Sequence, residues 1–104
     1  DQGYSGCNIT YPFKQMAIES VQNCEASAQL VGATNTIKFS TETHAINTDY
    51  SGFVRAITSK LDKHEIGSTL ILGAGGVGRA VAFGLASFSA GTCRIFDPSV
   101  DKAL

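Results

Sequence analysis

The chain has 104 residues, of which 43% are hydrophobic and 16% charged, and its formal net charge is −1. A charge so near zero argues against binding to nucleic acid or to an anionic membrane, and the apolar runs are far shorter than the roughly 20 residues of a membrane span. No signal-like segment opens the sequence, and its three cysteines, at 7, 24 and 93, are spaced for neither a disulfide framework nor a zinc site, so we expect a cytoplasmic protein with reduced thiols and no metal.

The first part of the sequence alternates short apolar runs with polar turns. A short strand is expected over residues 6–10. A helix is expected from Pro12 to about Val21, because proline suits the first turn of a helix. A second short helix is expected over 25–30, and Gly32 then interrupts the pattern.

A β-hairpin is predicted next. The β-rich runs 34–39 and 44–47 flank a polar turn at 40–43. Thr48 or Asp49 can then cap a helix. Apolar residues of this helix recur with the 3.6-residue period of a buried face: Tyr50, Phe53, Val54, Ile57 and Leu61.

The polar segment 62–67 is predicted to link two domains, residues 1–61 and residues 68–104. The second domain begins with the continuous apolar run Thr69–Leu72, which is typical of a parallel strand covered on both faces. Apolar residues at helical spacing follow, and a second strand is expected over 92–96. Together these elements predict a βαβ unit.

The turn between this strand and its helix is rich in glycine and contains the pattern G-x-G-x-x-G. Gly73 allows a tight turn, Gly75 lets a pyrophosphate approach the backbone, and Gly78 lets helix and strand pack closely. The start of the helix then offers N–H groups to phosphates. The pattern predicts a dinucleotide-binding site made by Gly73, Ala74, Gly75, Gly76, Val77 and Gly78.

An acidic residue, Asp97, stands 19 positions beyond Gly78, at the end of the next predicted strand. A carboxylate there can accept hydrogen bonds from the hydroxyls of the adenosine ribose and repel a 2′-phosphate, which favours NAD over NADP. The alternative is a glycine-rich turn without a ligand, with Asp97 merely ending the strand before Pro98. The strand, the glycines and the acidic residue occur together in the expected order, which favours the dinucleotide site.

Three polar clusters, residues 8–14, 32–36 and 47–53, lie at predicted strand ends or helix starts. Lys14 and Asp49 could form a proton-transfer pair, since an alcohol that is oxidised loses its hydroxyl proton as hydride leaves. The residues alone favour structural roles instead, with Lys14 solvated on a helix, Asp49 as an N-cap and Asn35 in a turn.

Four motifs in this order resemble the shikimate dehydrogenase family. They are Asn-Ile-Thr-Tyr-Pro-Phe-Lys at 8–14, Gly-Ala-Thr-Asn-Thr at 32–36, Asn-Thr-Asp-x-x-Gly-Phe at 47–53, and the glycine turn at 73–78. The second motif has Thr34 where the family has valine. The resemblance implies that Lys14 is the catalytic acid/base and Asp49 its partner. It also implies that three residues bind ring hydroxyls of the substrate: Thr10, Asn35 and Thr48.

The fold implied by the resemblance is α/β, the end of a substrate-binding α/β domain joined to the first βαβ unit of a Rossmann NAD(P)-binding domain. The implied activity is hydride transfer between NAD, with NADP as the alternative, and the ring alcohol of shikimate or quinate, whose ketones are 3-dehydroshikimate and 3-dehydroquinate. Most shikimate-specific members have Asn-Arg-Thr after the second strand. Here the chain reads Phe96-Asp97-Pro98-Ser99, which resembles the NAD-using quinate/shikimate branch.

Family enzymes are much longer than this chain, so we expect a fragment of a two-domain parent enzyme that is inactive by itself. An alternative is a non-catalytic binding module that keeps ligand recognition without turnover. Another Rossmann dehydrogenase, such as a methylene-tetrahydrofolate enzyme, shares the two-domain plan but does not explain the motif at 8–14 together with the one at 47–53. The choice between shikimate and quinate and the oligomeric state stay open.

Overall fold

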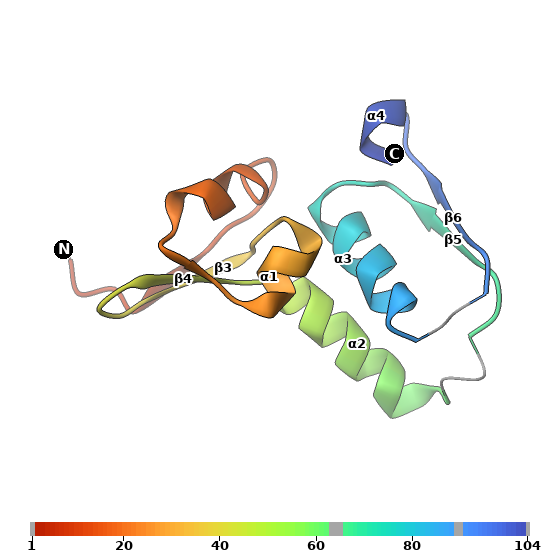
Figure 1. Ribbon diagram of the computed structural model, residues 1–104, viewed down its shortest axis with the longest axis horizontal. Helices are drawn as coiled ribbons and strands as arrows, with labels where there is room; N and C mark the ends of the chain where they lie inside the picture. Colours follow the sequence, from red (N-terminus) through yellow and green to blue (C-terminus); the bar gives the residue numbers. More distant parts are fainter. Residues whose placement is uncertain (1, 63–65, 89–90, 104) are drawn as a thin grey trace. The chain divides into compact units, whose positions relative to one another are not determined.

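The computed structural model describes residues 2–62, 66–88 and 91–103, which form two compact units (Figure 1). The first unit ends at Thr48 and the second begins at Asp49. Residues 63–65 of the expected linker lie outside the described residues, and the domain division at 62–67 stays a prediction. None of the described helices is long and apolar enough to cross a membrane.

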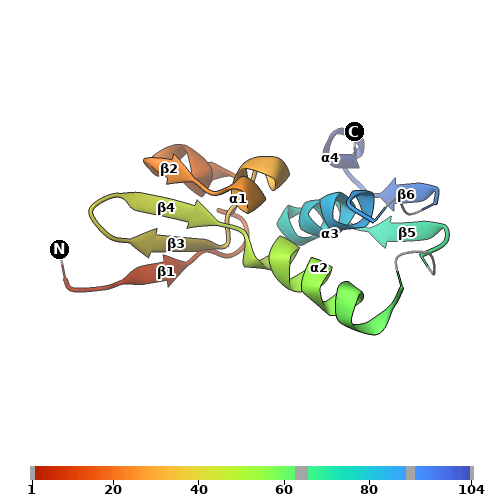
Figure 2. The same ribbon diagram turned by 60° about the horizontal axis from the view of Figure 1, so that its bottom comes forward.

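The first unit is built on a four-stranded sheet in the order β1-β3-β4-β2 (Figure 2). Its strands are β1 Gly6–Asn8, β2 Asn23–Cys24, β3 Thr36–Phe39 and β4 Thr43–Ile46. The antiparallel pair β3–β4 confirms the predicted hairpin, and β1 pairs antiparallel with β3. Strand β2, parallel to β4, was not predicted, because two residues are too few to show a periodic pattern.

The helix predicted from Pro12 to Val21 is wrong. The structure has turns over residues 11–15, after a cis Tyr11–Pro12 peptide bond, and a short 3₁₀ helix η1, Met16–Ser20. The physical reason lies in the Lys14 carbonyl, which accepts the Thr34 N–H at 2.8 Å. This bond from a distant segment replaces the bond that would have continued a regular α-helix.

The second short helix is confirmed as α1, Ala26–Val31, which ends at Gly32. Ala28 and Val31 of this helix are fully buried, and α1 contacts β4 of the sheet. The sheet contributes Ile37 and Ala45 to the same core. Because most of these side chains are small, the helix and the sheet can approach closely.

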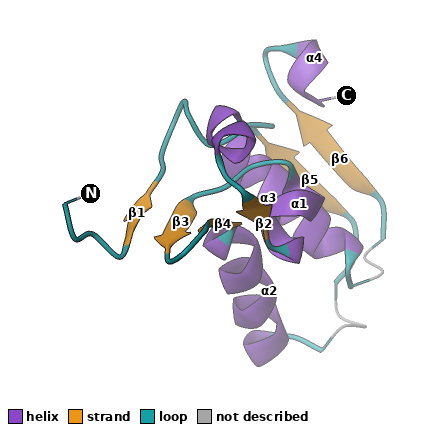
Figure 3. Ribbon diagram, turned by 60° about the vertical axis from the view of Figure 1, so that its left-hand side comes forward, coloured by secondary structure: helices purple, strands orange, loops and turns teal. Residues whose placement is uncertain are grey.

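Helix α2, Thr48–Lys60, begins at the last residue of the first unit and otherwise belongs to the second. The second unit also contains β5 Thr69–Leu72, α3 Gly76–Ala86, β6 Cys93–Phe96 and α4 Val100–Ala103 (Figure 3). Strands β5 and β6 are parallel, in register from Thr69 opposite Cys93 to Leu72 opposite Phe96. Helix α3 connects them and contacts β5, which confirms the predicted βαβ unit.

The apolar face predicted for α2 has the correct phase but is only half-buried, and Leu61, just beyond the helix, is 43% exposed. Part of this face packs on α3. A Cβ added at Gly84 would lie 2.6 Å from the Phe53 ring, so the aromatic ring rests against the bare backbone of α3. The absence of a side chain at Gly84 is therefore what lets the two helices meet.

The expectation that both faces of β5 are covered is wrong for the structure as it stands. Ile71 is buried, whereas Leu70 and Leu72 are 64% and 75% exposed. Side chains of a strand alternate between its faces, and α3 packs against one of them. The apolar run thus predicted the strand correctly, but in this chain one face of the strand carries exposed leucines.

Candidate functional site

The glycine turn has the backbone geometry expected of its first and third glycines. Gly73 adopts φ of +102°, a conformation that favours glycine, and its N–H donates to the Phe96 carbonyl at 2.7 Å. A Cβ at Gly78 would overlap the Gly73 carbonyl. The chain can therefore leave β5, turn and enter α3 only because both positions lack side chains.

The space over the middle of the turn is open. A Cβ at Gly75 would meet nothing within 4 Å, and Gly75 is exposed. Helix α3, 11 residues long, begins directly after it, and the first N–H groups of a helix have no acceptor within the helix. Because a phosphate can approach both the bare backbone and these N–H groups, the turn fits the pyrophosphate of a dinucleotide.

Asp97 closes the turn from the end of β6. One carboxylate oxygen, Oδ2, accepts the Ala74 N–H at 2.8 Å, and the other, Oδ1, accepts the Ser99 N–H at 2.8 Å. These two hydrogen bonds lower the pKa of Asp97, the bond from Ala74 contributing most. A carboxylate has about four acceptor positions, so an ionised Asp97 keeps capacity for ribose hydroxyls.

The sequence predicted a ligand contact for Asp97 but not its bonds to the backbone. The spacing between Asp97 and the glycines indicated that these bonds were possible, because the carboxyl ends of adjacent parallel strands meet at one edge of a sheet. Leu72 and Phe96 are opposite each other at that edge. The residues that follow them, Gly73 and Asp97, are therefore brought side by side.

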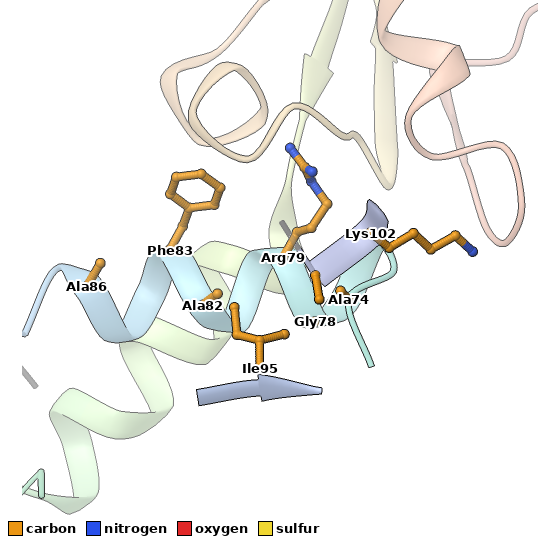
Figure 4. A pocket seen from close by; sticks show the side chains of 9 residues that line it. Ala74, Gly78, Arg79, Ala82, Phe83, Ala86, Ile95 and Lys102 are labelled. Carbon is orange, nitrogen blue, oxygen red and sulfur yellow. The ribbon is translucent and has the colours of Figure 1, made fainter. Parts of the chain in front are cut away.

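A pocket of about 350 Å³ lies beside the turn in the second unit (Figure 4). Its walls are mostly small or apolar, and its lining residues are Ala74, Gly78, Arg79, Ala82, Phe83, Ala86, Ile95, Lys102 and Ala103. The side chains of Arg79 and Lys102 extend away from Ala82 and Ile95 (Figure 4). Two cationic groups thus border a pocket that begins at the turn, a feature the sequence did not indicate.

In the first unit, the structure brings together two residues predicted to bind substrate, Asn35 and Thr48. The Asn35 Nδ2 donates to Thr48 Oγ1 at 2.7 Å, and the Thr48 N–H donates to Asn35 Oδ1 at 2.8 Å. The Thr36 hydroxyl also donates to Oδ1, at 3.2 Å. Asn35 therefore caps the start of α2 from the neighbouring turn, a structural role that the sequence had placed at 48 or 49.

Two buried polar residues beside this pair, Thr34 and Asn47, were not predicted as site residues. Both are 0% exposed. The Asn47 Nδ2 donates to the Ala33 carbonyl at 2.9 Å, and the Asn47 N–H donates to the Ser27 hydroxyl at 3.1 Å. Both lie within motifs that the sequence singled out, 32–36 and 47–53, but most of their hydrogen-bond partners, among them Ser27, Ala33 and Ile46, are 12 to 20 positions away.

The other predicted substrate residues lie on separate segments. Lys14 is half-buried in the turns at 11–15, and Thr10 is exposed, with its carbonyl accepting the Phe13 N–H at 2.9 Å. Asp49 is half-buried in the first turn of α2. Lys14 belongs to the first unit and Asp49 to the second, so their pairing stays a prediction.

No group of three His, Cys, Asp or Glu side chains that could hold a metal ion occurs among the described residues. The three cysteines are free thiols. Two of them, Cys7 and Cys93, are exposed, and burial raises the pKa of the Cys24 thiol.

Comparison with known proteins gives matches along almost the whole chain. The family model described as the shikimate dehydrogenase substrate binding domain matches residues 1–37. A shikimate dehydrogenase (NADP(+)) from Methanothermobacter thermautotrophicus is 41% identical over 102 residues, which are 97% of this chain and 36% of that protein.

Two solved structures resemble the fold closely. Shikimate 5-dehydrogenase from Thermus thermophilus, in complex with NADP(H) and shikimate, has a TM-score of 0.83 and 32% identity, over 98% of this chain and 39% of its own. Quinate dehydrogenase from Corynebacterium glutamicum, in complex with NAD, has a TM-score of 0.85 and 34% identity, over 97% of this chain and 36% of its own. The chain thus spans well under half the length of these relatives.

Proposed function

The chain belongs to the shikimate dehydrogenase family, and we propose that it is part of a longer oxidoreductase that moves hydride between NAD and the ring alcohol of shikimate or quinate. The observation that carries the proposal is the glycine turn of the second unit. Its open Gly75 and its bond to Asp97 suit a dinucleotide. The match of residues 1–37 to a substrate-binding domain supports the substrate half.

The cofactor would lie on the turn 73–78. NAD, when bound, would supply the group that accepts hydride as the alcohol is oxidised. The N–H groups at the start of α3 would hold its pyrophosphate, and the remaining acceptor positions of Asp97 would hold the ribose hydroxyls.

Two opposing charges bear on the choice between NAD and NADP. The negative charge of Asp97, whose pKa is lowered, would repel a 2′-phosphate. Arg79 and Lys102 at the nearby pocket would attract one. We favour NAD, because the carboxylate is fixed at the turn by two backbone bonds whereas long basic side chains lose entropy when they are ordered on a ligand.

Residues of the polar motifs would act on the substrate. Lys14 would take the hydroxyl proton of the ring alcohol during oxidation, and Asp49 would stabilise the charged lysine. The Thr48 oxygen accepts a hydrogen bond from Asn35, so the hydroxyl proton of Thr48 can be donated to a ring oxygen. Thr10 would contribute a further hydroxyl.

The test is a rate comparison with the purified full-length protein. Shikimate and quinate are each assayed with NAD and with NADP, and reduction of the nicotinamide is followed by absorbance. We expect turnover of at least one acid, with kcat/KM about tenfold higher for NAD than for NADP, a difference of about 1.4 kcal/mol.

Three other outcomes of this test would change the proposal. A preference for NADP would show that the basic residues outweigh Asp97. Tight binding of cofactor and acid without turnover would favour a non-catalytic binding module. If none of the four pairs is bound or turned over, the proposal that the full-length protein is a dehydrogenase is refuted.

A further inference from the structure

Thr34 lies at the meeting point of the segments that carry the predicted substrate residues. Its backbone N–H donates to the Lys14 carbonyl at 2.8 Å. Its hydroxyl Oγ1 lies 2.7 Å from the Ile46 carbonyl, two residues before Thr48, and 2.9 Å from the Thr36 carbonyl. One buried residue is therefore bonded to the segment of Lys14 and to both strands of the hairpin.

The hydroxyl makes a satisfied buried network. It has one proton, which it shares between the two carbonyls, and its oxygen accepts the Thr36 N–H at 3.3 Å. Removing such a donor from a buried carbonyl destabilises the folded state, because no water molecule takes the donor's place. Valine, which stands at this position in the family motif, has the same shape but cannot make these bonds.

These bonds fix the backbone on both sides of Asn35. The Asn35 N–H donates to the Ile46 carbonyl at 3.3 Å, a long bond, whereas the Thr34 hydroxyl reaches the same oxygen at 2.7 Å. The Asn35 side chain in turn holds both the hydroxyl and the N–H of Thr48. A hydroxyl at position 34 thus reinforces the weaker contact beside it.

We propose that Thr34 is a positioning residue, which holds the Asn35–Thr48 pair in the orientation that binds the ring hydroxyls of the substrate. The proposal rests on the proposed function for its substrate. The placement of the pair by Thr34 can be measured without any substrate.

The test compares Thr34→Val with the wild-type full-length protein. This variant keeps the shape of the side chain and the N–H bond to Lys14, and it removes only the hydroxyl. We expect KM for the ring acid to rise about fivefold to tenfold, with Kd for NAD changed less than about twofold, because the proposed NAD site is the turn 73–78 and the substitution leaves that turn unchanged. By NMR, we expect the Asn35 side-chain amide protons to exchange about tenfold faster with solvent.

Two controls separate positioning from a general loss of stability. Thr34→Ser keeps the hydroxyl and is expected to retain KM and the slow exchange. Val31→Ala removes buried volume from α1 in the same unit and alters none of the groups bonded to the Thr34 hydroxyl, so it should lower the melting temperature without raising KM. If Thr34→Val does not fold, Thr34→Ser and Thr34→Ala form a second pair that differs only in the hydroxyl, and the same contrast is expected between them.

Wild-type KM and unchanged Asn35 exchange in Thr34→Val would overturn the proposal. So would a rise in KM for Val31→Ala as large as that for Thr34→Val, since it would reflect loosening of the whole unit. If the wild-type protein turns over neither acid, the proposed function fails, and the NMR comparison alone still decides whether Thr34 places the pair.

Discussion

The carboxylate of Asp97 accepts N–H groups from Ala74 and Ser99, which lie 25 positions apart in the chain. One side chain therefore joins the glycine turn to the start of α4. The same two bonds place the pKa of Asp97 below its ordinary value of 3.8. Because this group is also the predicted contact for ribose, removing it should affect both the fold and the cofactor.

Replacing Asp97 by Asn should weaken both functions. The amide presents an NH₂ group where one carboxylate oxygen accepted a backbone N–H, and its charge is zero. We expect Kd for NAD to rise about tenfold and the preference for NAD over NADP to shrink by a similar factor. Asp101→Asn in exposed α4 makes the same change in net charge and is the matched control.

The stabilisation that Asp97 provides should depend on pH. Because the pKa of Asp97 is lower in the folded state, its stabilising effect is present above the unfolded pKa and is lost as the pH falls through the folded pKa. Urea unfolding should therefore separate wild type from Asp97→Asn at pH 7, and the difference between the two proteins should shrink as the pH falls through the lowered pKa of Asp97. Equal stability of the two proteins at pH 7 would contradict this assignment.

Lys14 is the residue on which the predicted proton transfer depends. In Lys14→Ala, no group takes the hydroxyl proton, so kcat should fall by about 10²- to 10⁴-fold while Kd for NAD stays within about twofold. Stopped-flow rates and a cofactor titration measure the two quantities. Lys38→Ala, an exposed lysine on β3, is the control, and an unaltered rate in Lys14→Ala would remove that residue from the mechanism.

At the scale of elements, the passage from β5 to α3 depends on two glycines with different surroundings. The position of a Cβ at Gly78 is blocked by the Gly73 carbonyl, whereas that at Gly75 faces open space. Gly75 also has φ of −74°, which alanine adopts without strain. The two positions therefore separate packing from ligand approach.

Alanine at each position tests this separation. Gly78→Ala should lower the free energy of unfolding by about 1–3 kcal/mol, because helix and turn must move apart, and should weaken NAD binding as well. Gly75→Ala should leave stability within about 0.5 kcal/mol and raise Kd for NAD at least about tenfold. Unfolding curves and NAD titrations of both variants are the measurements, and unchanged NAD affinity in Gly75→Ala would mean that the pyrophosphate lies elsewhere.

At the scale of the whole molecule, the chain combines a first unit, whose residues 1–37 match a substrate-binding domain model, with a second unit that contains a βαβ unit and a glycine-rich turn. Its surface carries exposed apolar side chains on that second part, among them Leu70, Leu72 and Phe96. Such a patch is costly in water. The chain spans 36% of the length of the Methanothermobacter relative, and in a longer protein further residues could cover these side chains.

The 104-residue chain by itself should therefore differ from the full-length protein. We expect it to show no turnover with either acid. We also expect the fluorescence of a bound hydrophobic dye such as ANS, divided by the number of residues, to be higher than for the full-length protein. A dye titration and a coupled turnover assay on both proteins make the comparison. Turnover by the short chain would show that both sites are complete within it.

Local patterns in the sequence predicted the elements that carry a regular period or turn residues within their own segment. The period of α2, the hairpin β3–β4 and the unit β5-α3-β6 were all predicted from spacing and turn residues. The glycine turn was equally predictable, because its close approaches involve residues within five positions, such as Gly73 and Gly78.

The tertiary structure decided what depends on partners far apart in the chain. A hydrogen bond from Thr34 to Lys14 shortened the helix expected after Pro12. The Thr48 N–H is capped by the side chain of Asn35, 13 positions earlier in the chain. The second role of Asp97, as an acceptor for Ala74, appeared in the same way. Periodicity reports which side chains are apolar along one segment, but a hydrogen bond between segments forms only where the fold brings a donor and an acceptor together.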